Sequence, residues 1–195
     1  MIAVLALQGA FVEHQQMLQR LDVNSILIRN IDDWNSFISS SSNGDKSQAI
    51  GQGLIIPGGE STAMTRIMRD NGLWQPIHDA INDGLPVFGT CAGMIMLDHD
   101  HLGTMDMKVK RNAYGRQLGS FVANHQVEGI GVVPMTFIRA PYIEYVGEGV
   151  EILSVLDNHV IAARQGNQFV CSFHPELTND TRTHEYFLKI AGFKN

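Results

Sequence analysis

The chain has 195 residues, enough for one domain with a sizeable core and too few to suggest two, so we expect a single domain over residues 1–195. Its 44% hydrophobic and 17% charged residues are ordinary for a soluble globular protein, and no apolar run approaches membrane-spanning length. The formal charge of −6 and the scarcity of Lys/Arg clusters argue against nucleic acid, which favours a basic surface. We therefore expect neither a membrane nor a nucleic acid as a partner.

The apolar residues 1–7 have neither the basic leader nor the small-residue cleavage site of a signal peptide. We expect a buried strand there and a cytoplasmic location. The two cysteines, Cys91 and Cys171, are too few for a disulfide framework, and the cytoplasm would keep both reduced. One of them is a candidate for a reactive thiol.

Short apolar runs alternate with helix-like stretches along the first half of the chain, which is the order of an α/β fold. Residues 38–53 are rich in Ser, Asn, Gly and Gln, so we expect an exposed inserted loop there. Because parallel strands need right-handed crossover connections, this half predicts a doubly wound sheet. We expect strands at 2–7, 25–29, 54–56 and 87–89, helices at 11–21 and from 94, and two helical stretches that break near Asn71-Gly72.

The second half is richer in strands, with short apolar runs separated by turn signals. A helical pattern then closes the chain. We expect strands at 132–135, 137–138, 150–156, 159–163 and 168–173, and a helix at 183–191.

Residues Gly89 to Gly93 read Gly-Thr-Cys-Ala-Gly, which fits G-x-C-x-G, the thiol counterpart of the nucleophile elbow between a strand and a helix. A sharp turn of this kind strains the backbone of the nucleophile and requires small neighbours. It also puts Cys91 at a helix N-terminus, where the dipole favours a thiolate. The alternative is a buried structural cysteine beside incidental glycines.

Residues 173–176 read Phe-His-Pro-Glu and supply a candidate base. Pro175 favours an extended conformation before it, and residues two apart in an extended stretch point the same way. His174 could then face Cys91 while Glu176 fixes its tautomer, which gives a Cys-His-Glu triad. The alternative is a strand-end histidine next to a local carboxylate.

The other histidines lack such a coupling, and the i, i+2 spacing of His99 and His101 would bind a metal only weakly. We expect neither a metal nor a cofactor.

The segment Pro57-Gly58-Gly59-Glu60-Ser61-Thr62 follows a strand and opens a helix, so its N–H groups can point into the same cleft. A tetrahedral oxyanion needs two aligned donors, and the expected pair is the N–H of Gly59 with that of Ala92. The alternative is a helix-capping turn with Ser61 or Thr62 as N-cap, and both interpretations can hold together.

With these motifs, the chain resembles the class I glutamine amidotransferases, and within them the glutaminase subunits of pyridoxal 5'-phosphate synthases. The resemblance runs nearly end to end. Outside the elbow and the Pro-Gly-Gly turn it rests on Leu7-Gln8-Gly9-Ala10 with Glu13-His14, Arg111-Asn112, Gly115-Arg116-Gln117, Ile138-Arg139-Ala140-Pro141, and Cys171 to Leu177. The chain departs from the family in its longer segment at 38–53, a shortened loop at 97–101, and Lys110 at an acidic position.

The resemblance implies a flavodoxin-like three-layer α/β/α sandwich with a mostly parallel central sheet. It implies that Cys91, His174 and Glu176 are the triad. The glutamine site would be lined by Gly58, Gly59, Glu60, Arg111, Ile138 and Arg139. An arginine can hold the α-carboxylate of an amino acid and a carboxylate its ammonium, but without the family the two arginines would be ordinary surface residues.

By the same resemblance, L-glutamine is hydrolysed to L-glutamate and ammonia, which passes to a (β/α)8-barrel synthase subunit in a large hetero-oligomer for pyridoxal 5'-phosphate biosynthesis. We expect weak activity until docking, with a flip of the Gly58-Gly59 peptide completing the oxyanion hole. The docking face is expected to include residues 8–14, and the alternative is a helix cap with exposed Glu13 and His14.

Two other functions stay open. The chain could be the glutaminase of another synthase, or a γ-glutamyl hydrolase. It could also be a non-catalytic, thiol-bearing regulatory protein.

Overall fold

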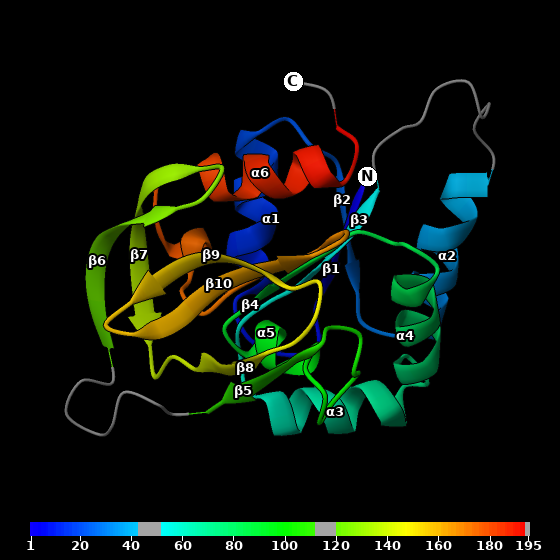
Figure 1. Ribbon diagram of the computed structural model, residues 1–195. Coiled ribbons are helices and arrows are strands. Elements are labelled where there is room, and N and C mark those ends of the chain that lie inside the picture. The colour runs from blue at the N-terminus through cyan, green and yellow to red at the C-terminus, as the bar shows by residue number, and fades with distance from the viewer. Residues whose placement is uncertain (43–51, 112–119, 194–195) are drawn as a thin grey trace.

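The computed structural model describes residues 1–42, 52–111 and 120–193. Within them the chain forms a nine-stranded sheet, a two-stranded sheet and flanking helices (Figure 1). In chain order the elements are β1 (Ile2–Leu5), α1 (Phe11–Arg20), β2 (Ser25–Ile28), α2 (Ile31–Ser42), β3 (Gly53–Ile56), α3 (Ser61–Asp70), α4 (Trp74–Asn82), β4 (Val87–Thr90), α5 (Ala92–Met96), β5 (Met107–Lys110), β6 (Ser120–Val127), β7 (Gly131–Ile138), β8 (Tyr142–Val146), β9 (Glu151–Leu156), β10 (His159–Gln165), β11 (Gln168–Cys171), the 3-10 turn η1 (Pro175–Leu177) and α6 (Arg182–Ile190). None of the described helices is long and apolar enough to cross a bilayer.

The parallel part of the main sheet has the order β2-β1-β3-β4-β11. Among these strands this is the 2-1-3-4-5 order of flavodoxin-like folds, in which ligands bind beyond the carboxyl ends of the strands. The registers bring those ends level, because Ile56 of β3 lies beside Gly89 of β4, and Thr90 of β4 lies beside Cys171 of β11. The segments that follow these three strands therefore leave the sheet at one edge.

The rest of the sheet is antiparallel, with β10 paired to β11, β9 and β8, and β8 paired to β5. The sheet is thus mixed, and its parallel strands carry the edge described above. The predicted α/β class and flavodoxin-like arrangement are confirmed.

Both faces of β1, β3 and β4 are buried, because every side chain of these strands is buried and successive ones point to opposite sides of the sheet. Ala3 and Leu5 belong to a core that α2, α3, α4 and α5 cover, whereas Ile2 and Val4 belong to one that α1, α6 and the β6–β7 hairpin cover. In Figure 1, α6 lies above the sheet while α3 and α5 lie below it. These layers form the predicted α/β/α sandwich.

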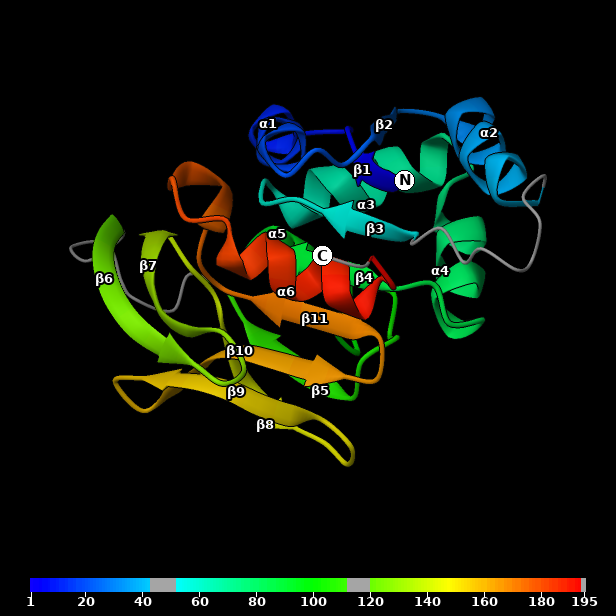
Figure 2. The ribbon, with the colours of Figure 1, turned by 90° about the horizontal axis from the view of Figure 1, so that it is seen from above.

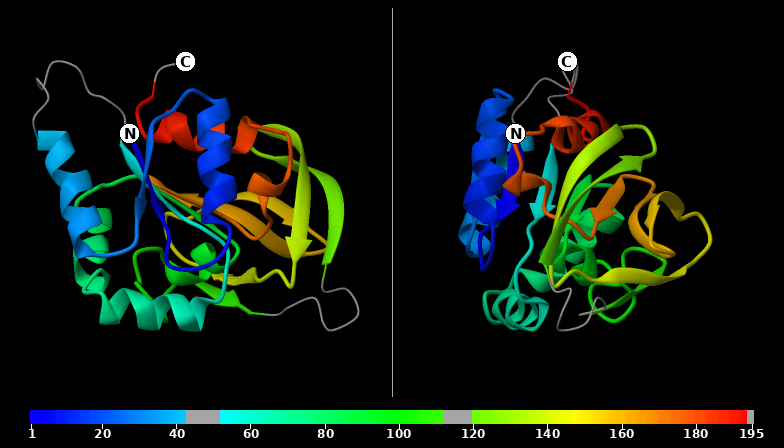
Figure 3. Two further views of the ribbon diagram at one scale, coloured as in Figure 1. Left: turned by 180° about the vertical axis from the view of Figure 1, so that it is seen from behind. Right: turned by 90° about the vertical axis from the view of Figure 1, so that its left-hand side faces the viewer.

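The antiparallel hairpin of β6 and β7 lies at one end of the main sheet (Figure 2). The runs expected at 132–135 and 137–138 are parts of the single strand β7, and its Pro134 is compatible with a sheet edge. The turn η1 packs against both β7 and α1, and it is seen in orange between them from behind (Figure 3, left). This packing brings the residues after β11 next to α1.

The expectation of a loop over residues 38–53 is wrong at both ends. Helix α2 continues through Ser42 and β3 begins at Gly53, while residues 43–51 lie outside the described residues. Asn112 and the Gly115-Arg116-Gln117 motif also lie outside them. The sequence did not predict α2, β5, β6 or β8.

Candidate active site

The predicted elbow is present between β4 and α5. Cys91 has φ 50° and ψ −105°, a strained conformation for a residue with a side chain. A Cβ on Gly93 would overlap the carbonyl oxygen of Ile56, and one on Gly89 would lie 2.6 Å from the carbonyl oxygen of Gly93. Both glycines of the motif are therefore required by close backbone contacts, with β3 and within the turn.

The two cysteines differ in their surroundings. Cys91 retains 8% exposure at the edge of a cavity, and its N–H donates to the carbonyl of Cys171 at 2.8 Å. Cys171 is fully buried, and burial, with the nearby Glu176 carboxylate, raises the pKa of its thiol well above the usual range. Cys91 is therefore the reactive candidate. Because α5 has only five residues, its dipole contributes little.

His174 and Glu176 are in contact behind the thiol. The Glu176 Oε1 lies 2.7 Å from the His174 Nδ1, and both side chains are buried. The contact was predicted from an extended backbone, and that reason is wrong because Glu176 lies in the 3-10 turn η1.

Electrostatics favour a charged pair. Burial alone would lower the pKa of His174, but hydrogen bonds with Cys91 and Glu176 and the attraction of both raise it to about 10. Burial would raise the pKa of Glu176, yet its interactions with His14 and His174 lower it. At neutral pH an imidazolium therefore lies between a carboxylate and the Cys91 sulfur.

The Pro-Gly-Gly turn lies against the same side chains. A Cβ on Gly58 would overlap the His174 ring and lie 3.3 Å from the Cβ of Cys91. The Gly58 carbonyl accepts a hydrogen bond from the Ala10 N–H at 3.2 Å. Because the described peptide bonds are all trans, the Gly59 N–H points away from Ala10.

Glu60 is the N-cap of helix α3. Its carboxylate accepts hydrogen bonds from the N–H groups of Thr62 at 3.2 Å and Ala63 at 3.0 Å, and its own N–H donates to the Oε1 of Gln8. These helix N–H groups, that of Ala63 above all, lower the pKa of Glu60. The expectation of Ser61 or Thr62 as N-cap is therefore wrong.

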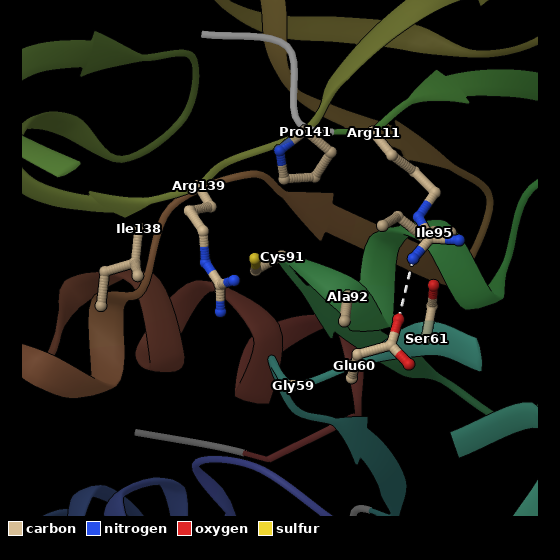
Figure 4. Close-up of a pocket in the computed structure, with 10 residues that line it drawn as sticks. All are labelled: Gly59, Glu60, Ser61, Cys91, Ala92, Ile95, Arg111, Ile138, Arg139 and Pro141. Atoms are coloured by element: carbon tan, nitrogen blue, oxygen red, sulfur yellow. Dashed lines mark hydrogen bonds and ion pairs between the residues drawn. The ribbon is translucent and has the colours of Figure 1, made fainter. Parts of the chain in front are cut away.

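Most residues expected at the site line one cavity of about 150 Å³ (Figure 4). The Arg139 and Arg111 side chains lie on opposite sides of Cys91, and Arg111 Nη2 is 2.8 Å from the Glu60 carboxylate. Arg139 has φ 44°, which turns the chain sharply after β7. The cavity is lined by Gly59, Glu60, Ser61, Cys91, Ala92, Ile95, Arg111, Ile138, Arg139 and Pro141.

A second hollow of about 260 Å³ shares Cys91 and adds Gly58 and His174. It also reaches Gln8 and Ala10. All site residues expected from the sequence therefore lie on one of the two hollows, except Glu176, which is buried behind His174.

Residues 8–14 were expected on a docking face, with an exposed His14 at a helix cap as the alternative. The His14 side chain is fully buried, so it can neither contact a partner nor be exposed at a cap, while docking through the rest of the segment stays a prediction. His14 contacts His184 of α6 and lies 3.5 Å from Glu176. This contact was not predicted from the sequence. A signal existed, because His14 lies three and four residues before the buried Met17 and Leu18 on one face of α1.

Among the residues that the structure describes, no group of three or more His, Cys, Asp or Glu side chains is arranged to hold a metal ion. His99 and His101 each pair instead with an aspartate, Asp106 and Asp98, at 2.8 Å.

The chain is similar to known glutamine amidotransferases along nearly its whole length. The model of the SNO glutamine amidotransferase family matches residues 4–192. The chain is 51% identical over 201 aligned residues, covering 100% of this chain and 99% of the relative, to the "Pyridoxal 5'-phosphate synthase subunit PdxT" of Streptococcus pneumoniae strain D39. The protein of the same name from S. pneumoniae strain TIGR4 has the same identity and coverage.

Solved structures are also similar. A crystal structure of a glutamine amidotransferase superimposes with a TM-score of 0.85 at 39% identity, covering 98% of this chain and 99% of that one. A glutamine amidotransferase from Thermotoga maritima, with a TM-score of 0.59 at 11% identity over 96% of this chain and 81% of that one, shares the fold.

Proposed function

Because the chain belongs to the SNO glutamine amidotransferase family, we propose that it is the glutaminase subunit of a pyridoxal 5'-phosphate synthase. It hydrolyses L-glutamine to L-glutamate and ammonia for a synthase subunit. The observation that supports this most directly is a cysteine on a strained elbow, at the edge of a cavity, with a buried His174–Glu176 pair against it.

Cys91, His174 and Glu176 act as the triad. The Cys91 sulfur, as a thiolate, attacks the side-chain amide carbon of glutamine, and the imidazolium of His174 gives its proton to the departing ammonia. A glutamyl thioester remains. Neutral His174 then takes a proton from water, which attacks the thioester and releases glutamate, and the thiol is restored. Glu176 supports the imidazolium in both steps.

The N–H groups of Gly59 and Ala92 stabilise the oxyanion of both tetrahedral intermediates. Their place on the cavity beside Cys91 supports this. A flip of the Gly58-Gly59 peptide would break the bond between the Gly58 carbonyl and the Ala10 N–H. This turn is the element through which docking controls activity.

Glutamine lies between Arg111 and Arg139, which bracket Cys91 (Figure 4). One guanidinium holds its α-carboxylate, and Glu60 holds its ammonium. Gly58 and Ile138 complete the contacts. Glu60 and Arg111 already pair at 2.8 Å, so a bound amino acid would insert its two charges into an existing ion pair.

Ammonia is protonated in water, so its transfer requires a shielded path to a second active site. The partner is a (β/α)8-barrel synthase subunit in a large hetero-oligomer, in line with the name of the S. pneumoniae relatives. We place the complex in the cytoplasm, where a reducing environment keeps the Cys91 thiol free.

The test is glutamine-dependent release of ammonia, measured with and without the synthase subunit. The mixture is expected to release ammonia and make pyridoxal 5'-phosphate, and Cys91→Ala is expected to abolish both reactions with glutamine. The matched control is Cys171→Ala, which should retain them.

Supplying ammonium salts distinguishes a loss of glutamine hydrolysis from a loss of complex formation. The complex with Cys91→Ala should still make product from ammonium, because the synthase subunit is intact. Ammonia release by Cys91→Ala would refute the nucleophile, and product formation only with a different synthase would favour the glutaminase of another pathway. If the wild-type chain released no ammonia from glutamine in any mixture, a regulatory protein would be favoured.

A further inference from the structure

Two buried histidines extend the triad into the core. The Nδ1 of His14 lies 2.9 Å from the Nε2 of His184, and the Nε2 of His14 lies 3.2 Å from the Oγ1 of Thr90. The same Nε2 is 3.5 Å from the Oε2 of Glu176. Both imidazoles have 0% exposure. Polar rings are costly to bury, so apolar packing alone does not explain this row of two histidines, His14 and His184.

The contacts fix the tautomers. If His14 carried its proton on Nδ1, the lone pair of its Nε2 would face the Glu176 carboxylate, and His184 would be left with a buried N–H at Nδ1. With the His14 proton on Nε2 instead, no lone pair faces the carboxylate and His184 has no buried N–H without a partner. His184 then donates from Nε2 to the Nδ1 of His14, and the Nε2–H of His14 points toward Thr90 and Glu176. The group of His184 that lacks a partner among the described side chains is then the Nδ1 lone pair, not an N–H.

Both rings are neutral in this arrangement. Burial lowers the pKa of His14, more than the carboxylates of Glu176 and Glu13 raise it, and the charge of His174 lowers it further. Burial and His14 hold the pKa of His184 well below its usual range. The row therefore presents an N–H dipole to the carboxylate without adding a charge.

We propose that His14, oriented by His184, is a positioning residue that holds the Glu176 carboxylate in place for His174. Glu176 uses Oε1 for His174, and among the described residues Oε2 has no hydrogen bond and faces His14. Without the N–H of His14, this buried oxygen would lose the N–H dipole that lies 3.5 Å from it. The inference rests on the proposed function and deepens it by naming a residue that acts through Glu176.

The position of His14 predicts how its loss should affect kcat and KM. His14 lines neither hollow beside Cys91, so glutamine binding should not depend on it. His14→Leu removes the N–H, and we expect kcat to fall about tenfold while KM stays within about twofold. His14→Gln can place an amide N–H near the position of Nε2, and it should recover most of kcat.

The fall of kcat at high pH gives a second measurement, which would not change if His14 served only to pack the core. This basic limb of the pH profile reports loss of the His174 proton, which is held by Glu176 and Cys91. With Glu176 less well positioned in His14→Leu, the limb should move to lower pH. Among the described residues, the carboxylate of Glu13 also acts on His14, and the thiol of Cys171 lies close enough to Glu176 to be affected by its charge.

A double-mutant cycle tests whether His14 acts through Glu176. In a Glu176→Gln background there is no carboxylate to position, so adding His14→Leu should cost little further kcat. All variants are assayed with the synthase subunit, and thermal unfolding and complex formation establish that each is folded. Equal losses in both backgrounds, or an unmoved basic limb, would overturn the proposal.

One measurement needs no variant. Long-range ¹⁵N–¹H NMR of histidine-labelled protein reports the tautomer, and we expect His14 to be neutral with its proton on Nε2. A proton on Nδ1, or a doubly protonated ring at pH 7, would contradict the proposal even if His14→Leu failed to fold. If wild-type protein with the synthase subunit released no ammonia, the proposed function would fail, while the NMR result would still decide the tautomer.

Discussion

The Cα of Gly93 lies so close to the carbonyl oxygen of Ile56 that no side chain fits between them. Gly93→Ala must therefore push α5 away from β3, and overpacking of this kind costs about 1–3 kcal/mol. Because Cys91 precedes α5 directly, glutamine hydrolysis should fall at least as clearly as stability. Urea unfolding and ammonia release measure the two effects.

Gly72→Ala is the matched control for Gly93→Ala. Gly72 has φ +68° and nothing within 4 Å of an added Cβ, so alanine there should cost only the strain of a left-handed backbone, about 1–2 kcal/mol. Activity at a temperature where the variant is folded should be unchanged. If Gly93→Ala were equally active, the close contact would not control the elbow.

The two thiols should react very differently. A glutamine-mimicking electrophile is expected to label wild-type protein once, at Cys91, because burial keeps the Cys171 thiol protonated at pH 8. Cys171→Ala should still take one label and Cys91→Ala none, as read by intact-mass spectrometry. A label on Cys171 in the folded protein would contradict the assignment of the reactive thiol.

The site was predictable where close packing leaves room only for a glycine. Gly58, Gly89 and Gly93 each stand where a Cβ would overlap another atom, so the motifs around them record the geometry. Turns and hydrogen bonds that leave room for a Cβ have no such signature in the sequence. The 3-10 turn at Glu176 and the hydrogen bond from the Glu60 N–H to Gln8 depend on how the loops pack, and they could not be deduced from local patterns.

The parallel strands were predictable because burial on both faces makes them continuous apolar runs. Strand β6, in contrast, alternates exposed and partly buried residues and includes Asn124 and His125. Helix α2 was hidden by its serines, although Trp34 and Phe37 are buried three residues apart. In this helix the spacing of the buried apolar residues indicates the structure better than the composition does.

Glu60 should have separable effects on stability and on glutamine. As an N-cap, it contributes about 0.5–2 kcal/mol that Glu60→Ala removes and Glu60→Asn largely keeps. Both variants lack the carboxylate that we assign to the ammonium of glutamine, so both should raise KM, by about tenfold or more. Chemical unfolding and steady-state kinetics measure the two effects. An unchanged KM in Glu60→Asn would exclude the binding role.

Arg111→Met is the companion to the Glu60 variants. The ion pair between these residues is about half exposed, and exposed pairs contribute about 0–1 kcal/mol, so stability should barely change. KM for glutamine should nevertheless rise, because a guanidinium that we assign to the α-carboxylate is lost. If Arg111→Met had the wild-type KM, then of Arg111 and Arg139 only Arg139 could hold the α-carboxylate of the substrate.

His174 should make stability depend on pH in the alkaline range. Its pKa is raised from 6.5 to about 10 in the folded protein, so folding favours the protonated ring. The stabilisation is fully present below pH 6.5 and is lost as the pH rises toward 10. The free energy of unfolding of wild-type protein, minus that of His174→Gln, should therefore decrease from pH 6.5 to pH 10.

The Cys91→Ala background tests the source of that pH dependence. Burial opposes the charge on His174, and the hydrogen bond with Cys91 is the largest of the contributions that raise its pKa. Without the thiol, the folded-state pKa should be lower, and the stability difference that His174→Gln produces should vanish at a lower pH. Titration of urea midpoints at several pH values measures this shift. An identical pH dependence in both backgrounds would mean that Glu176 alone holds the charge and that the thiol is not coupled to the imidazole.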